Sequence, residues 1–188
     1  SSQEFTEGGE RVVEKFSAKD ARTVFLRRPI WEDLDGLMEL INSLVREEAP
    51  INRMEGVSRS EEIKFLTKRL SNIEKGEIIQ LVAEVDGAIA GNAEITKLSG
   101  REAHVGRLGI GVKKGYRRIG IATGMIESLL RQAKKHGLKI ILLAVYANNL
   151  PAITLYKKLG FREIGRTPKG VRWKGEYIDD IRMALEIN

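Results

Sequence analysis

The sequence predicts a mixed α/β domain built around one sheet, and three observations carry this prediction. Residues 78–95 hold two strand-like runs on either side of Asp86-Gly87, a dipeptide typical of two-residue hairpins. Residues 140–145 (IILLAV) form a short, continuously apolar run, which is typical of a strand in the centre of a sheet. Apolar residues recur at helical spacing before, between and after these runs, so helices are expected to alternate with strands.

The N-terminal half is expected to contain a first strand, two helices and the hairpin. Thr23–Arg27 (TVFLR) predicts the strand, and apolar residues at helical spacing over 34–45 predict the first helix. Ser58-x-x-Glu61 is a capping-box pattern, which marks the start of a second helix that ends near Gly76.

The next strand, predicted over 102–112, contains three glycines, which weaken a strand. They indicate a bulge or a ligand backbone lying close, while a flexible edge strand explains them equally well. A helix is predicted over 117–135. Asn149 is a good N-cap for a further short helix, which ends at Gly160.

Residues 161–173 and 177–185 predict two closing strands. The order β-α-α-β-β-β-α-β-α-β-β gives a central twisted mixed sheet of about seven strands with four helices. We expect residues 22–188 to form one domain. Residues 1–21 are polar and lack periodicity, and we expect them to be a mobile N-terminal arm.

The composition excludes several classes of protein. The 188 residues include no cysteine and only two histidines, so a disulfide framework, a thiolate nucleophile and a metal site are not expected. No apolar run approaches the roughly 18 residues of a membrane span, and no signal-peptide pattern opens the chain. We therefore expect a soluble cytoplasmic protein with no membrane partner. The net charge of +6 permits contact with nucleic acid without establishing it.

Residues 112–122 (VKKGYRRIGIA) have the features of an anion-binding loop that opens a helix. A helix N-terminus carries unpaired N–H donors and a partial positive charge, and anions bind there. Gly120 and Ala122 are small enough to let the backbone approach a phosphate. Arg117 and Arg118 add fork-shaped donors suited to phosphate oxygens.

Positive charge is concentrated around this loop. Eight Lys and Arg residues and a single acid, Glu127, lie between Lys113 and Lys139. For Arg131, Lys134 and Lys135 a solvated helix face is the simpler explanation.

Two motifs in this order resemble the GNAT superfamily of N-acetyltransferases. Residues 117–122 (RRIGIA) match the family's phosphate signature Gln/Arg-x-x-Gly-x-Gly/Ala, with Val112 five residues before it. Residues 149–161 (NLPAITLYKKLGF) match its late Asn-x-x-Ala-x-x-Leu-Tyr-x-x-x-Gly-Phe element. The resemblance covers about residues 22–187. It implies the acyl-CoA N-acyltransferase fold, acetyl-CoA as donor and a primary amine as acceptor.

The resemblance implies a role for each matching position. The backbone at 110–112 would pair with the pantetheine arm, and the amides of 117–123 would cradle the pyrophosphate. Asn149 would touch the pantetheine or acetyl end, and Tyr156 would protonate the leaving thiolate. From the residues alone, Asn149 is also a plain helix cap and Tyr156 a core aromatic. The expected cofactor-binding residues are Ile110, Gly111, Val112, Arg117, Arg118, Ile119, Gly120, Ile121, Ala122, Thr123, Asn149 and Tyr156.

The general base is less well specified. A lysine-like amine with a pKa of ~10.4 must lose a proton before it attacks the thioester. Many family members place a glutamate where this chain has Gly106. His104, on the same face, has the most suitable unperturbed pKa (~6.5), although an exposed strand residue is an equally good description of it. The remaining options are Glu84, Glu94 and Asp180.

The strand around His104 resembles members that act on small molecules, so we expect the acceptor to be a small amine such as an amino acid or polyamine. A protein N-terminus or ribosomal protein is the alternative, as is a domain that senses acetyl-CoA without catalysis. In this family, acids of the first segment would line the acceptor cleft. Their more common explanation is a position at a helix end or on a solvated face. These acids are Glu47, Glu48, Glu55, Glu61 and Glu62.

Other classes fit less well. The glycine motifs of dinucleotide-binding and P-loop proteins do not occur. A nucleic-acid-binding module would use 113–139 with Trp173 and Tyr177, but the aromatic content is only 6%, and the charge coincides with the expected coenzyme A phosphates. Nucleic acid is therefore not an expected partner. A homodimer through the last strands is a family expectation.

Overall fold

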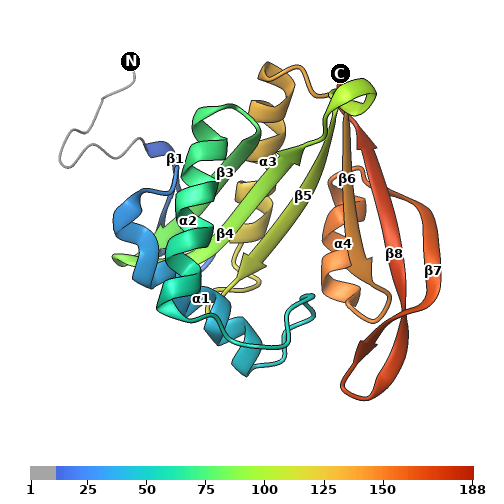
Figure 1. The fold of residues 1–188 in the computed structure, drawn as a ribbon, viewed down its shortest axis with the longest axis horizontal. Coiled ribbons are helices and arrows are strands. Elements are labelled where there is room, and N and C mark those ends of the chain that lie inside the picture. The colour runs from blue at the N-terminus through green and yellow to red at the C-terminus, as the bar shows by residue number, and fades with distance from the viewer. Residues whose placement is uncertain (1–11) are drawn as a thin grey trace.

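A single sheet of eight strands runs through the computed structural model, which describes residues 12–188 (Figure 1). The strands are β1 (Val12–Ser17), β2 (Thr23–Arg27), β3 (Ile78–Val85), β4 (Ala88–Lys97), β5 (Val105–Val112), β6 (Ile140–Tyr146), β7 (Arg162–Trp173) and β8 (Glu176–Glu186). The helices are α1 (Leu34–Arg46), α2 (Arg59–Glu74), α3 (Ile121–Lys135) and α4 (Leu150–Lys158). The strands lie in the order β1-β2-β3-β4-β5-β6-β8-β7, and the β5–β6 pair is parallel. The predicted mixed α/β fold is confirmed.

The helices cover both faces of the sheet, because successive side chains of a strand point to opposite faces. Val82 of β3 packs with Leu37 of α1 and Leu66 of α2 in one buried cluster. Its neighbour Leu81 belongs to the main core on the other face, together with Met125 of α3. In Figure 1, α1 and α2 accordingly lie in front of β3 and β4, with α3 behind them.

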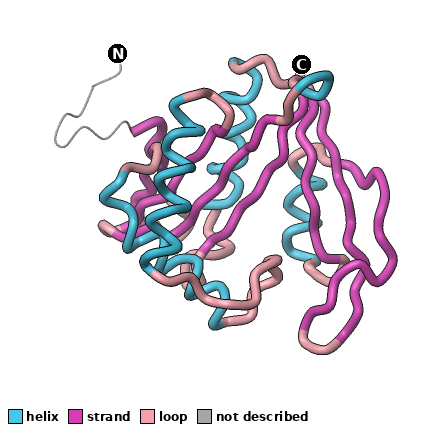
Figure 2. The backbone as a smooth tube through the Cα atoms, in the orientation of Figure 1, coloured by secondary structure: helices cyan, strands magenta, loops and turns pink. Residues whose placement is uncertain are grey.

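The sheet opens between β5 and β6. These strands pair only where Val105–Arg107 face Ile140–Leu142, and beyond this point they diverge (Figures 1 and 2). β4 continues beside β5 as far as Val112, and β8 continues beside β6 as far as Tyr146. The backbone edge of residues 108–112 therefore faces an opening instead of a neighbouring strand.

The eighth strand lies in the segment predicted to be a mobile arm. That prediction is wrong for Val12–Ser17, which forms β1 and pairs antiparallel with β2 through a tight turn in which Ala21 has a φ of 69°. The strand is mostly exposed and carries little apolar patterning, so its stability depends on β2. The rest of the predicted arm, residues 1–11, lies outside the described residues.

The local signals for turns and caps are confirmed. The Ser58 side chain accepts a hydrogen bond from the Glu61 amide (3.2 Å), and the Ser58 amide donates to the Glu61 carboxylate (2.9 Å). Asp86 and Gly87 have φ values of 51° and 77°, as a two-residue hairpin turn of this kind requires. No helix within residues 12–188 is long and apolar enough to cross a membrane.

Candidate active site

The loop between β5 and α3 presents a helix N-terminus. The helix begins at Ile121, four residues later than predicted, because Gly120 occupies the N-cap position with a φ of 94°. Its first intrahelical hydrogen bond runs from the Gly124 amide to the Gly120 carbonyl (3.1 Å). The N–H groups of residues 121–123 precede that bond, so they are available to an anion.

Arg117 lies in this loop and is held by two contacts. Its Nε donates to the Val112 carbonyl (2.8 Å), and its guanidinium pairs with the Glu47 carboxylate just beyond α1. Arg118 is exposed and has a φ of 62°. Both arginines line the same cleft as the helix N-terminus, so they add positive charge beside the free amides.

The turn between β1 and β2 supports the loop from behind. The Lys19 amide donates to the Ile119 carbonyl (2.9 Å), and Arg22 donates to the Gly115 carbonyl (3.0 Å). The Arg22 guanidinium also lies 4.6 Å from the centroid of the Tyr116 ring. These contacts could not be predicted from the sequence, because two of the three are made to backbone atoms of the loop.

A cleft of about 590 Å³ lies between the diverging strands; we call it the β5–β6 cleft. It contains most of the residues predicted to hold a cofactor: Ile110, Gly111, Val112, Arg117, Arg118, Gly120, Ala122, Thr123, Asn149 and Tyr156. The remaining two, Ile119 and Ile121, pack against the core, so only their backbone groups can serve the cleft.

Asn149 and Tyr156 come from α4 on the β6 side of the cleft. Asn149 caps α4, accepting a hydrogen bond from the Ala152 amide (3.4 Å). Tyr156 is 8% exposed and packs edge-on against Phe161 at 6.0 Å between ring centroids. Burial raises the pKa of Tyr156 to about 12, so its phenol stays protonated at neutral pH.

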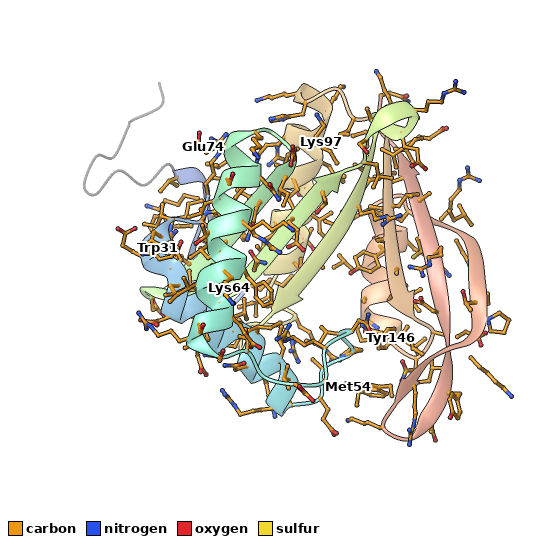
Figure 3. All side chains as sticks on the ribbon, in the orientation of Figure 1. Trp31, Met54, Lys64, Glu74, Lys97 and Tyr146 are labelled. Atoms are coloured by element: carbon orange, nitrogen blue, oxygen red, sulfur yellow. The ribbon has the colours of Figure 1, made fainter. Side chains whose placement is uncertain are left out.

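A second cavity, of about 460 Å³, lies between the sheet and helices α1 and α2; we call it the β4 cavity. It shares Leu44, Ile51, Ile110 and Gly111 with the β5–β6 cleft, so the two spaces meet beside the end of β5. The loop between α1 and α2 borders this junction. Trp173 of β7 donates its Nε1 hydrogen to the Glu48 carbonyl on that loop (3.0 Å). In Figure 3, Met54 marks the loop and Tyr146 the end of β6.

The glycines of β5 shape the floor of the β4 cavity. A Cβ atom at Gly109 would lie 2.8 Å from Oε1 of Glu94, and one at Gly111 would lie 2.9 Å from Leu44. A Cβ at Gly106, on the other face, would lie 2.5 Å from Ile95. The pairing of β4 with β5 shows no register shift, so the predicted bulge does not occur there. In the strand order β5 lies between β4 and β6, although β6 pairs only with its first residues, and the glycines of β5 allow close packing.

Glu94 is the acid that faces the β4 cavity. Its side chain is 24% exposed, and Arg69 Nη1 lies 3.7 Å from its Oε2. Burial raises the pKa of the Glu94 carboxyl, while Arg69 and a hydrogen bond from Asn92 oppose this shift. Glu62 lines the same cavity, and burial raises the pKa of its carboxyl too.

The structure does not bring His104 to either cavity. It is exposed at the start of β5, eight residues before Val112, which at ~3.3 Å per residue places it about 26 Å away along the strand. The geometry therefore does not support His104 as the base. Two other options are also engaged elsewhere, since Glu84 accepts a hydrogen bond from Arg27 (3.1 Å) and Asp180 pairs with Arg182 at 3.0 Å.

Among residues 12–188, no cluster of three or more His, Cys, Asp or Glu side chains could hold a metal ion. The arrangement thus consists of an anion site, a connected cavity with a half-buried acid, and a protonated phenol.

Comparison with known proteins gives a consistent result. The model of a family described as "Acetyltransferase (GNAT) family" matches residues 39–161. L-amino acid N-acetyltransferase AaaT of Escherichia coli (strain K12) is 34% identical over 110 residues, which cover 57% of this chain and 67% of that protein. An N-alpha-acetyltransferase of Sulfurisphaera tokodaii is 32% identical over 107 residues, covering 50% of this chain and 63% of the relative. The chain thus matches about two thirds of the length of each relative.

A solved structure shows the same fold. The putative acetyltransferase yncA of Salmonella typhimurium, determined with its cofactor acetyl-CoA, superposes with a TM-score of 0.78. It is 19% identical, and the match covers 88% of this chain and 94% of that chain.

Proposed function

The chain belongs to the GNAT family of acetyltransferases, and from this premise we propose that it transfers an acetyl group from acetyl-CoA to a primary amine by direct attack on the thioester. The observation that carries the proposal is the meeting of two spaces at Ile110 and Gly111. One space ends in a cationic helix N-terminus, and the other holds the half-buried acid Glu94. A donor and an acceptor entering from opposite sides would therefore meet at the end of β5.

The β5–β6 cleft suits coenzyme A along its length. The N–H groups of residues 121–123, with Arg117 and Arg118, would bind the pyrophosphate. The backbone edge of 108–112, which faces no strand, would pair with the amides of the pantetheine arm. The Salmonella typhimurium protein of the same fold was solved with acetyl-CoA, which supports this assignment.

We assign Glu94 as the general base. An amine with a pKa of ~10.4 is about three units from its nucleophilic form at neutral pH, a cost of ~4–5 kcal/mol. A carboxylate with a raised pKa is a better base than an ordinary one. Glu94 faces Gly109, two residues before the junction at Gly111, so a proton would pass to it directly or through one water.

We assign Tyr156 as the general acid. Its buried phenol lines the cleft on the side opposite β5 and keeps its proton at neutral pH. A group of this kind can protonate the thiolate that leaves when the thioester breaks. The oxyanion formed during attack needs a donor, and a backbone N–H near Val112 is the candidate.

The acceptor is proposed to be a small molecule such as an amino acid or a polyamine. The relative from Escherichia coli, an L-amino acid N-acetyltransferase, supports the former. A protein N-terminus is the alternative, supported by the relative from Sulfurisphaera tokodaii. A domain that senses acetyl-CoA without catalysis is disfavoured by the placement of Glu94 and Tyr156. A cytoplasmic location and a homodimer remain predictions.

Release of free coenzyme A tests the proposal. The protein is incubated with acetyl-CoA and, in turn, amino acids, polyamines and basic peptides, and the new thiol is measured. We expect release that depends on both protein and amine. If the protein binds acetyl-CoA but none of the amines in the panel causes release of coenzyme A, the sensing role would be favoured.

A further inference from the structure

Besides the proposed base Glu94, the β4 cavity carries charged and polar groups that the acetyl transfer itself does not require. Resting on the proposed function, we propose that the acceptor is an α-amino acid with an apolar side chain. Gln80 and Glu94 would hold its ammonium group, and Arg69 would hold its carboxylate. All three residues line the cavity.

A chain of hydrogen bonds orients the ammonium site. Asn92 Nδ2 donates to Glu94 Oε2 (3.3 Å), and Gln80 Nε2 donates to Asn92 Oδ1 (2.6 Å). An ionised carboxylate can only accept, so Glu94 fixes which way the Asn92 amide points, and Asn92 in turn fixes Gln80. The carbonyl oxygen of Gln80, a residue that lines the cavity, is thereby left as an acceptor.

That oxygen lacks a partner. Gln80 is 2% exposed, and its Oε1 accepts no hydrogen bond from any residue among 12–188. A buried acceptor without a donor costs free energy, so such groups in proteins call for an explanation. An ammonium group has three donors, and it would satisfy Gln80 Oε1 and the Glu94 carboxylate together.

Arg69 supplies the opposite charge beside this site. Its Nη1 lies 3.7 Å from Glu94 Oε2, which is beyond hydrogen-bond distance. By contrast, the structural pair of Arg27 with Asp33 has contacts of 2.7 and 2.8 Å. In an α-amino acid only two bonds of about 1.5 Å separate the nitrogen from the carboxyl carbon. Its two charges therefore match the spacing of Glu94 and Arg69.

The whole cavity is balanced in charge. Arg53 and Glu62 also line it, which gives two guanidinium and two carboxylate groups. A zwitterion meets a complementary partner at each end. A polyamine has no carboxylate to pair with the two arginines. Any amine without a carboxylate would likewise leave Arg69 without a contact to the acceptor.

The apolar side of the cavity would take the side chain of the amino acid. Leu37, Leu40 and Leu66 are buried and line it, and Phe65 lies beside them beneath the Arg53 guanidinium (5.6 Å to the ring centroid). Burial of an apolar side chain there is favourable. The volume of about 460 Å³ lies within the range of small-molecule sites.

The test compares matched acceptors by coenzyme A release. The acceptors are L-leucine, L-methionine and L-phenylalanine, with L-leucinamide as the partner of leucine that lacks the carboxylate, and spermidine as the polyamine. We expect kcat/KM for leucine to exceed that for leucinamide by about 10- to 100-fold, the usual effect of a charge-assisted contact. Spermidine should be poorer than leucine.

Variants of Arg69 then identify the carboxylate contact. In Arg69→Gln the ratio of leucine to leucinamide should fall towards one, and Arg69→Lys should keep part of it because the charge remains. Arg59→Gln is the control, since Arg59 is on the same helix but pairs with Asp35 outside the cavity. Thermal unfolding checks that each variant is folded. The comparison of acceptors uses the unaltered protein, so it tests the inference even if a variant does not fold.

Three results would overturn the inference while leaving the acetyltransferase proposal intact. The first is a preference for leucinamide or spermidine over leucine, and the second is an unchanged preference for leucine in Arg69→Gln. The third is that none of the three amino acids causes release of coenzyme A, although another amine does. Failure of the proposed function is a different result, in which the protein neither binds acetyl-CoA nor releases coenzyme A with any amine.

Discussion

The carboxylate of Glu94 occupies the space that a side chain at Gly109 would fill. The two residues are cross-strand neighbours on β4 and β5, and a Cβ at position 109 would lie 2.8 Å from Glu94 Oε1. A glycine on one strand thus determines where the acid on the next strand lies. The cavity floor depends on this pair as much as on the acid itself.

Gly109→Ala should therefore displace Glu94 and slow catalysis. A misplacement of about 1 Å can cost up to ~10²-fold in rate, so we expect kcat to fall by about 10- to 100-fold with little change in the affinity for acetyl-CoA. Overpacking should also lower stability, by about 1–3 kcal/mol. Steady-state kinetics and thermal unfolding measure the two effects. Gly165→Ala is the matched control, because no atom lies within 4 Å of a Cβ there; unchanged kinetics in Gly109→Ala would contradict the role given to this glycine.

Glu94→Gln should remove the base, lowering kcat by about 10²- to 10⁴-fold. Because burial raises the pKa of Glu94 above its ordinary 4.5, activity of the unaltered protein should rise with pH through that raised pKa. The variant should lack this acidic limb. His104→Ala should keep it, and loss of the limb in that variant would instead restore His104 as the base.

The same substitution should have the opposite effect on stability. An acid whose pKa is raised by folding contributes stability below its unfolded pKa of 4.5, and this contribution is lost as pH rises through the folded value. Glu94→Gln should therefore raise the melting temperature at pH 7–8 relative to the unaltered protein, and the difference should shrink towards pH 4. Part of the pH dependence should persist because burial also raises the pKa of Glu62. The contrary result would be a difference in melting temperature, variant minus parent, that is smaller at pH 8 than at pH 4.

Tyr156→Phe should lower kcat by about 10²-fold or more, since the leaving thiolate loses its proton donor. With a pKa of about 12, the phenol should remain protonated across the working range, so the unaltered protein should show no loss of rate from this group below about pH 10. The pH profile of kcat from pH 6 to 10 measures this. Full activity in Tyr156→Phe would exclude the phenol as the acid.

Arg117→Gln should weaken acetyl-CoA binding by about 10- to 100-fold, because a charge-assisted contact with phosphate is lost. Arg131→Gln is the control, as Arg131 pairs with Glu14 on the outside of α3. The dissociation constants of both variants can be compared by calorimetry at one salt concentration. Equal affinity in the two variants would place the phosphates elsewhere.

The parts of this fold that sequence could predict are those fixed by local patterns. The capping box at Ser58 and Glu61, the turn at Asp86-Gly87 and the apolar run of β6 each depend on neighbouring residues, and each is found where expected. β1 was not predictable in this way. It is mostly exposed, and the turn that follows it makes its contacts with the β5–α3 loop to residues about a hundred positions away.

The candidate site divides in the same manner. The helix N-terminus at Gly120 has a local signature, so the half proposed to bind the cofactor could be located from sequence. The acceptor half depends on which residues face one another across β3, β4 and β5. The pairing register of these strands decides this. Gln80, Glu94 and Gly109 form one such row, and no spacing along the chain relates them. His104 was favoured for its pKa, and only the strand length shows that it lies at the far end.

The measurement that tests the central claim most directly is a calorimetric titration of the unaltered protein with acetyl-CoA. If the β5–β6 cleft is a coenzyme A site, the titration should saturate at one ligand per chain, and the ligand should raise the melting temperature. The absence of both heat and stabilisation at millimolar acetyl-CoA would contradict the account.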